Sequence, residues 1–293
     1  MNDWDLGLLL GSPFFMRFFI GWFRPKISII GCEMAGEVEA VGDEVTRFKP
    51  GNKVYCDLSY GRFGAYAEYV CVKESELGHM PTNLSFAQAA AIPHAGLLAL
   101  QSLKEIAGLR EGQSVLINGA GGGVGTLGLQ YAKLFRYRVT GVDSARKAEY
   151  MHLLSFDKVI DYEQEDFATN GRQYDVILDA QSKRSPFACA EALNPGGVYI
   201  TVGGDMRRIL QCVLFKKWIA WRHNKRIEVL GLKPNRGLDY LTGLIESGKI
   251  LPAIDKRYPL EEIKDAITRF NDKKHCGKIV VLVTDSSPET SDA

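Results

Sequence analysis

The sequence lacks the cysteine and histidine patterns that hold metal ions or disulfides. Its six cysteines are scattered, with no CxxC pair, and its five histidines form no HExxH motif. These absences argue against a zinc finger, a zinc protease and a secreted disulfide scaffold. Scattered cysteines are typical of a reducing compartment, so we expect a cytoplasmic protein. The net charge is only +1, and no overall field would attract nucleic acid.

Long hydrophobic runs are scarce as well, and the longest lies near the start, at residues 6–23. It is interrupted by Pro13 and Arg17, and it follows Asp3 and Asp5 rather than the basic residues of a secretory signal. A spanning helix needs about 20 apolar residues. A central charge costs roughly 2.5 to 3.5 kcal/mol on insertion. The run is therefore expected to be buried or covered surface of a globular domain.

The remaining sequence divides into a β-rich part and a part in which strands and helices alternate. Short period-two segments separated by turn residues predict that the first hundred residues are mostly β, followed by a helical stretch over 84–107 that is broken at Pro93. Alternation predicts a doubly wound parallel sheet of the α/β class. Its expected strands are 114–117, 138–142, 158–160, 175–178, 198–202 and 227–232, with helices at 124–135, 145–154 and 186–193. Helices at 238–247 and 260–271 and a strand at 278–283 precede a polar tail that we expect to be disordered.

The strongest functional signal is the segment SVLINGAGGGVGTLGLQYAKLF, residues 114–135. A buried strand leads into a glycine-rich turn and then into a helix, which is the context that a dinucleotide-binding fingerprint requires. Ala120, Gly122 and Gly125 occupy its three positions. Glycines there allow a tight turn and a close approach to a diphosphate, which binds at the positive helix end. The residues expected to contact the cofactor are Ala120, Gly121, Gly122, Gly123, Val124 and Gly125.

The end of the second expected strand gives two conflicting signals about the nucleotide. Asp143 follows Gly125 at close to the ~20-residue spacing of the acid that binds the ribose of NAD(H). Ser144, Arg146 and Lys147 come directly after it and suit the additional phosphate of NADP(H). A carboxylate cannot face that phosphate unless the cations outweigh it. We favour NADP(H), while NAD(H) and an ordinary solvated turn stay open.

The sequence also resembles a known family, the zinc-free quinone oxidoreductase (zeta-crystallin-like) branch of the medium-chain dehydrogenase/reductase superfamily. The resemblance covers nearly the whole chain and rests on GCEMAGEVEAVGDEV, FKPGNKVY, GAYAEYV, AAAIPHAGLLALQSL, NGAGGGVG, VIDY, YDVILDA, LNPGGVYITVGG and CGKIVV, in that order. It implies a Rossmann domain and a GroES-like β-barrel domain. The expected division is barrel over 1–95, nucleotide domain over 96–250, return to the barrel over 251–284 and tail over 285–293.

The same resemblance implies further site residues. Gly203 and Gly204 are expected beside the nicotinamide, and Tyr162 and Lys147 at the adenosine end. Ala180 is expected to contact the cofactor, and Lys278 to lie near it. Asn2 is the candidate catalytic residue, bonding the substrate or the ribose, and Asp5 would orient it; a polar pair at a strand end is an equal alternative. Leu98 and Gln181-Ser182 depart from the family pattern, which puts catalytic efficiency in doubt.

The zinc-dependent members of the superfamily hold their metal with three residues, and the matching places here are Asn2, Cys32 and His94. One amide, one thiol and one imidazole are a poor set for zinc, so we expect no metal. Without one, the substrate must itself accept hydride well, and a quinone or an activated enone is implied. The alternative is a nucleotide-binding sensor or partner protein that has lost catalysis.

Two features concern stability and partners. In relatives, the residues that match Asn2 and Asp5 lie well inside the first domain, so the barrel is expected to be incomplete, through truncation or a misplaced start. The segment MRRILQCVLFKKWIAWRHNKR, 206–226, mixes basic and aromatic residues. Such a segment can lie on a membrane surface, but a lid or a homodimer interface is the more common use, and we favour a homodimer.

Overall fold

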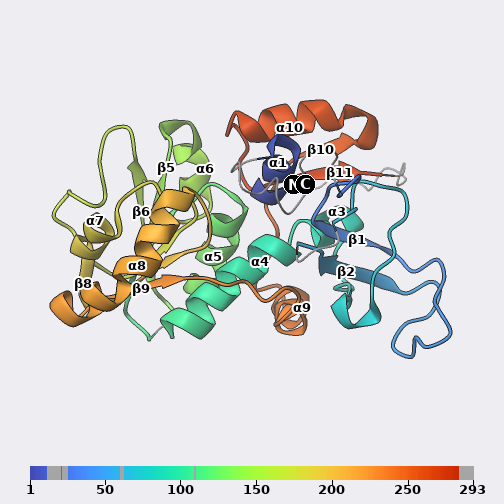
Figure 1. Cartoon of the computed structure of the whole chain (residues 1–293), viewed down its shortest axis with the longest axis horizontal. Coiled ribbons are helices and arrows are strands. Elements are labelled where there is room, and N and C mark those ends of the chain that lie inside the picture. Colours follow the sequence, from blue (N-terminus) through green and yellow to red (C-terminus); the bar gives the residue numbers. More distant parts are fainter. Residues whose placement is uncertain (12–20, 22–25, 60–62, 109, 284–293) are drawn as a thin grey trace. The chain divides into compact units, whose positions relative to one another are not determined.

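The computed structural model describes the chain except residues 12–20, 22–25, 60–62, 109 and 284–293. The chain forms two compact units, coloured by sequence in Figure 1. Unit 1 comprises residues 1–94, 234–246 and 254–293, and unit 2 comprises 95–233 and 247–253. The segment 234–246 was expected in the nucleotide domain. It groups with unit 1 because the Tyr55 hydroxyl bonds to Leu238 and Thr242, the latter at 2.7 Å.

Unit 2 is built on a parallel sheet whose six strands have the order β6-β5-β4-β7-β8-β9. The chain starts in the middle of the sheet at β4, winds outward to β6 and returns to the middle at β7. This topology confirms the predicted doubly wound Rossmann sheet, in which ligands bind outside the carboxyl ends of the strands where the order reverses. The strands are β4 Ser114–Asn118, β5 Arg138–Asp143, β6 Lys158–Asp161, β7 Tyr174–Asp179, β8 Leu193–Thr201 and β9 Arg226–Val229.

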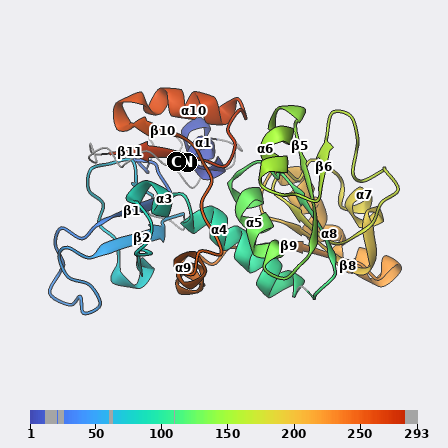
Figure 2. The same ribbon diagram turned by 180° about the vertical axis from the view of Figure 1, so that it is seen from behind.

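Helices cover both faces of this sheet (Figures 1 and 2). Parallel crossovers are right-handed. Helices between strands that step towards the β6 edge therefore lie on one face, and helices between strands that step towards the β9 edge lie on the other. One face carries α5 (Gly123–Lys133) and α6 (Ala148–Leu153), the other α7 (Pro186–Glu191) and α8 (Met206–His223). Cys212 and Ile219 of α8 join the core under the second face, with Leu116, Ile177 and Tyr199 of the sheet.

Unit 1 contains two small sheets. The first is antiparallel, in the order β1 (Glu33–Glu37), β2 (Lys53–Asp57) and β3 (Gly78–His79). In the second, β10 (Ile254–Pro259) pairs in parallel with β11 (Lys278–Leu282). These are the only strands in the described part of unit 1, so β structure is sparser than the sequence predicted, and β10 was not predicted. The α-helices that lie entirely within the described part of unit 1 are α1 Asp3–Leu10, α3 Phe86–Ala90, α9 Leu238–Glu246 and α10 Ile263–Asn271.

Helix α1 is the second element that sequence analysis missed. Asn2 and Asp5 form a capping box, in which the Asn2 side chain accepts from the N–H of Trp4 and the Asp5 carboxylate accepts from the N–H of Asn2. Gly11 ends the helix in the left-handed conformation. Most of the apolar run after Gly11, and the polar tail predicted to be disordered, lie outside the described residues.

The stretch predicted as helical over 84–107 consists of three pieces: α3, α4 (Pro93–Leu100) and a π-helical segment, Gln101–Ala107. The break falls just before Pro93, as predicted, since proline is tolerated only in the first turn of a helix. Within the part of the chain that the structure describes, no helix is long and apolar enough to cross a membrane.

Candidate functional site

The glycine-rich turn lies between β4 and α5, at the carboxyl edge of the central strand of unit 2. The N–H groups of Gly119 and Ala120 both donate to the carbonyl of Val142, which fixes the turn to β5. A Cβ on Gly125 would lie 2.3 Å from the carbonyl oxygen of Ala120. Glycine is therefore required there for helix and strand to pack closely, which is the role of the third fingerprint position.

The amino end of α5 points to this edge and is available to an anion. Its N-cap is Gly122, which offers no side-chain hydrogen bond. The first-turn amides of an α-helix have no partners within the helix and carry its positive dipole end. The backbone of the turn and these amides form the arrangement on which a diphosphate binds.

Asp143, at the end of β5, faces the glycine turn. One carboxylate oxygen accepts from the N–H of Gly121 at 3.0 Å and the other from the N–H of Ser144 at 2.9 Å. The ammonium of Lys147 lies 3.5 Å away, and both side chains are nearly buried. Asp143 is thus bound and compensated inside unit 2, whereas Arg146 is exposed. Of the two residues that give conflicting signals in the sequence, the acid is therefore paired and nearly buried and the arginine is exposed.

Tyr162 lies beside this group. Its N–H donates to the carbonyl of Asp143 at 3.1 Å, and its half-exposed ring has the ammonium of Lys183 5.6 Å from its centroid. Burial, followed by the nearby carboxylates of Glu163 and Asp143, raises the pKa of the Tyr162 hydroxyl. The structure therefore brings the predicted turn residues, Asp143, Lys147 and Tyr162 together at one edge of the sheet.

Sequence analysis missed a buried hydrogen-bond network at the end of β7. Asp179 is completely buried and accepts four hydrogen bonds within 2.9 Å. The donors are the Asn118 amide, the N–H groups of Gln181 and Ser182, and the Tyr199 hydroxyl. Burial and the adjacent carboxylate raise the pKa of Tyr199 far above its ordinary value, so it remains a donor. The sequence did contain a signal for this network: two otherwise buried, neighbouring strands, β4 and β7, end in the polar residues Asn118 and Asp179.

The network positions the loop that contains Ala180, whose N–H donates to the carbonyl of Asn118 at 3.0 Å. The loop approaches Gly204 so closely that a Cβ there would lie 2.1 Å from the carbonyl oxygen of Gln181, and Gly204 has φ +104°. A Cβ on Gly203 would meet nothing within 4 Å. Packing within unit 2 therefore explains why residue 204 is a glycine. The predicted contacts of Ala180, Gly203 and Gly204 with a cofactor stay predictions.

Unit 1 contains a second polar group, which we call the buried charge cluster: Glu33, Lys278, Cys32, Asp57 and His94. The Lys278 ammonium pairs with the Glu33 carboxylate and donates to the carbonyl of Met1 at 3.0 Å. The other Glu33 oxygen accepts from the N–H of His94 at 3.0 Å. Burial alone opposes ionisation of Glu33, but Lys278, the N-terminal ammonium and His94 outweigh it and lower its pKa from 4.5 to about 2. The predicted role of Lys278 beside a cofactor stays a prediction.

Three members of this cluster could hold a metal ion by their chemistry. The ligand atoms of Cys32, Asp57 and His94 lie within 4.8 Å of one another. Thiolate, carboxylate and imidazole are a set that zinc accepts, and sequence analysis missed Asp57 because it considered Asn2 as the third ligand. In the structure, His94 Nδ1 lies 2.9 Å from one oxygen of Asp57, and the other accepts from the N–H of Ser59. The Asn2 amide donates to the Cys32 sulfur.

The predicted catalytic pair lies next to the buried charge cluster. Asn2 and Asp5 are both buried. The Asn2 amide is shared between Cys32 and the first turn of α1, and Asp5 accepts from the Tyr66 hydroxyl at 3.0 Å. Burial and then Asp5 raise the pKa of Tyr66 well above its ordinary value. Asp5 contacts Asn2 by accepting from its backbone N–H, and the catalytic role of the pair stays a prediction.

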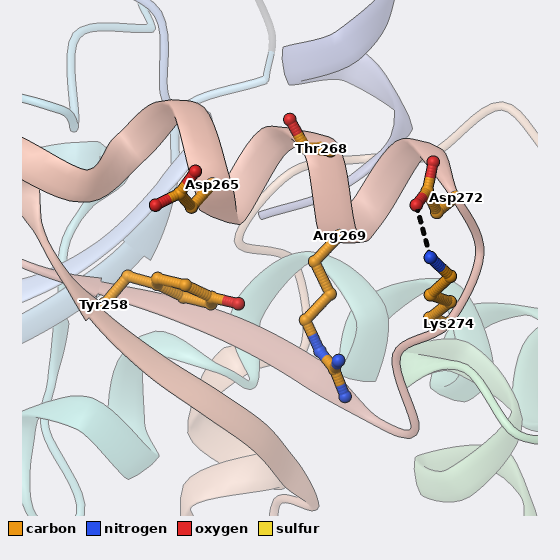
Figure 3. A pocket seen from close by; sticks show the side chains of 6 residues that line it. All are labelled: Tyr258, Asp265, Thr268, Arg269, Asp272 and Lys274. Carbon is orange, nitrogen blue, oxygen red and sulfur yellow. Dashed lines mark hydrogen bonds and ion pairs between the residues drawn. The ribbon is translucent and has the colours of Figure 1, made fainter.

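Figure 3 shows a separate small pocket in unit 1, about 220 Å³ in volume, between β10, α10 and the following turn. Its cations are already paired: Lys274 lies 2.7 Å from Asp272, and Arg269 donates to Asp255 at 2.9 Å. The pocket offers no unpaired charge from these two residues, and it lies outside the glycine turn and the buried charge cluster.

The chain is similar to known oxidoreductases over nearly its whole length. The family profile "Alcohol dehydrogenase GroES-like domain" matches residues 14–82, and "Zinc-binding dehydrogenase" matches residues 154–281. The chain is 31% identical to the chloroplast envelope quinone oxidoreductase homolog of Arabidopsis thaliana, over 95% of this chain and 85% of that protein. It is 32% identical to a quinone oxidoreductase of Pseudomonas aeruginosa, over 86% and 81%.

The chain is also similar in structure to solved proteins over nearly its whole length. The quinone oxidoreductase of Coxiella burnetii superposes with a TM-score of 0.84 at 28% identity, covering 97% of this chain and 87% of that one. The human synaptic vesicle membrane protein VAT-1 homolog-like protein superposes with a TM-score of 0.77 at 28% identity, covering 98% and 87%. The fold and site define a two-unit α/β oxidoreductase with a nicotinamide cofactor. The chain belongs to the quinone oxidoreductase branch of the medium-chain dehydrogenase/reductase superfamily.

Proposed function

We propose that this protein transfers hydride from NADPH to a quinone or an activated enone, without zinc. The observation that carries the proposal is the glycine turn, where Gly125 lies against Ala120 and no side chain caps α5. This arrangement fits a dinucleotide diphosphate. The substrate class rests on the quinone oxidoreductases among the relatives. When bound, the reduced nicotinamide supplies the hydride.

The residues of unit 2 contribute binding and orientation. The amides at the start of α5 neutralise the diphosphate, and Asp179 holds the loop 180–182 beside the end of β8 through its four hydrogen bonds. A loop fixed in this way would keep the nicotinamide ring in one orientation, which lowers the entropic part of the activation barrier for hydride transfer.

The preference for NADPH is supported by the division of charge at the end of β5. The carboxylate of Asp143 accepts two backbone hydrogen bonds and has Lys147 as its counter-ion. Arg146 is exposed two residues before the start of α6. Among the described residues no hydrogen bond or ion pair holds its guanidinium. It can bond a 2′-phosphate, because the charge that would repel the phosphate is already compensated.

Replacement of Arg146 by alanine is therefore expected to weaken NADPH binding about tenfold, the effect of losing one charge-assisted hydrogen bond, and to leave NADH binding unchanged. The dissociation constants of both nucleotides can be measured by isothermal titration calorimetry. Arg172→Ala, which removes an exposed cation elsewhere in unit 2, is the control and should change neither constant. An unchanged NADPH constant in Arg146→Ala would remove Arg146 from the phosphate site.

The zinc-free mechanism is supported by the pairing inside the buried charge cluster. Asp57 already bonds His94 and Ser59, Glu33 has Lys278, and the Cys32 sulfur accepts from Asn2. Burial, reinforced by Asp5 and Glu33, raises the pKa of Cys32 well above its ordinary value, whereas a zinc ligand must be a thiolate. If a zinc ion were bound, Cys32, Asp57 and His94 would hold it, and it would polarise a substrate oxygen.

The proposed activity is tested by following NADPH oxidation at 340 nm with a panel of quinones, enones and simple ketones before and after dialysis against a chelator. The metal content is measured on the protein before dialysis. We expect turnover with quinones or enones, none with simple ketones, and a metal content far below one ion per chain. Stoichiometric zinc that is lost in Asp57→Asn would contradict the zinc-free mechanism. Tight NADPH binding without turnover would favour the second candidate, a nucleotide-binding sensor, to which the departures at Leu98 and Gln181 point.

A further inference from the structure

Helix α8 has an apolar face that points away from its own unit. Cys212 and Ile219 are buried against the sheet, and with 3.6 residues per turn the opposite side of the helix is occupied by a different set. We call this set the outer face of α8: Met206, Leu210, Val213, Leu214, Lys217 and Trp221. Leu210, Leu214 and Trp221 are 56, 64 and 81% exposed. An exposed stripe of this kind marks an interaction surface.

The charges of α8 are of one sign. The helix contains five cations, and no aspartate or glutamate lies within Met206–His223. Lys216 lies 3.6 Å from Glu228 of β9, and Arg208 donates to Gln211. Arg207, Lys217 and Arg222 are exposed and have no ion-pair partner among the residues that the structure describes. The whole chain carries only +1, so positive charge is concentrated on this helix.

A second copy of the chain is a poor occupant of the outer face. A twofold interface brings the same surface of both copies together. Lys217 lies within the apolar stripe, between Leu214 and Trp221, so it would be buried opposite a face that contains no acid. An unpaired buried charge is strongly destabilising. The predicted homodimer would therefore have to use another surface.

We infer that the outer face of α8 binds the surface of a membrane that contains anionic lipid. The helix, about 27 Å long, would lie in the plane of the interface with its leucines and valine among the acyl chains. Trp221 suits the headgroup level, where tryptophan is enriched. Lys217 can extend along the apolar stripe to a lipid phosphate, and Arg207 and Arg222 flank it. This inference does not depend on the proposed reaction.

The test is flotation of the full-length protein with vesicles of phosphatidylcholine alone or with one third phosphatidylglycerol. Binding is expected only to the anionic vesicles and should fall as salt is raised. Leu214→Ser/Trp221→Ser should lower the partition coefficient at least tenfold, because it removes two apolar anchors. Leu153→Ser alters an apolar residue that is 77% exposed on α6 of the same unit and should have no effect.

The electrostatic contribution is tested separately. Lys217→Gln should weaken binding to the anionic vesicles about fivefold, the effect of one cation near such a surface. Lys249→Gln, which removes an exposed cation elsewhere in unit 2, should leave it unchanged. Failure to float with anionic vesicles at low salt, or equal binding to neutral ones, would overturn the inference. It would also be overturned if Leu214→Ser/Trp221→Ser converted a dimer to monomers in sedimentation velocity without altering vesicle binding, which would assign the face to a second copy.

Discussion

Replacement of Gly125 by alanine is expected to abolish measurable NADPH binding and to lower the free energy of unfolding by about 3 kcal/mol. The added methyl group would lie 2.3 Å from the carbonyl oxygen and 2.5 Å from the Cα of Ala120. Both are backbone atoms of a turn held to β5 by hydrogen bonds. Neither can move aside without separating α5 from β4. Calorimetric titration and chemical denaturation measure the two effects.

Gly122→Ala is the matched control in the same turn. Its methyl group would approach only the carbonyl oxygen of Gly119, at 3.4 Å, and Gly122 has φ −92°, which alanine adopts readily. We expect stability within about 0.5 kcal/mol of the wild type, with NADPH bound at least tenfold more weakly because the diphosphate must approach this backbone. Normal NADPH affinity in Gly125→Ala would refute the assignment of the turn to the diphosphate.

The second large effect is expected at Lys278. Lys278→Met should destabilise the protein by about 3 to 5 kcal/mol, because it leaves the Glu33 carboxylate buried without its counter-ion. Both side chains are at most 5% exposed, and Lys278 is the closest cation to Glu33. The double variant Lys278→Met/Glu33→Gln removes the uncompensated charge and should recover most of the loss. Urea denaturation of both variants at neutral pH makes the comparison.

Lys274→Met provides the control. Lys274 pairs with Asp272 at 2.7 Å, a distance that suits a strong ion pair, yet its side chain is 54% exposed. Exposed pairs contribute about 0 to 1 kcal/mol, so this variant should be close to wild type. If Lys278→Met were no more destabilising than Lys274→Met, the ion pair with Glu33 would not be a structural element of unit 1.

The same ion pair makes acid stability depend on Glu33. Its pKa is about 2 in the folded protein, below the ordinary 4.5, so the unfolded chain binds a proton more readily. The stabilisation of the folded protein by the ionised Glu33 is complete above pH 4.5 and is lost as the pH falls towards 2. Lys278→Met/Glu33→Gln should lack this part of the acid dependence, which denaturation curves between pH 5 and 2 would show.

The central features of unit 2 follow from local sequence. The alternation of strands and helices predicts the order of elements, and the turn around Gly125 is predicted because its glycines lie between a buried strand and an amphipathic helix. Both signals are short-range: they depend on periodicity and on backbone conformations that only glycine tolerates. Helix α1 had such a signal too, in the capping residues Asn2 and Asp5, but the apolar run obscured it.

What sequence could not predict are contacts between residues that are far apart in the chain. Asp179 accepts from Asn118, 61 positions earlier, and Asp57 meets His94 and Cys32 only after β1, β2 and α4 have packed. The π-helical segment Gln101–Ala107 could not be predicted either, because its composition resembles that of an ordinary α-helix. Burial and partners are tertiary properties, and no local pattern specifies them.

By itself, the sequence determined that this chain has a Rossmann unit, where its nucleotide turn lies and to which superfamily it belongs, because these depend on the order of short motifs. Only the tertiary structure decided how the charges are divided. It bound Asp143 to Lys147 and left Arg146 exposed, and it buried Lys278 against Glu33. It also turned the apolar side of α8 outward. The physical reason is that the effect of a charge or an apolar surface depends on what packs against it, and the folded chain alone defines those neighbours.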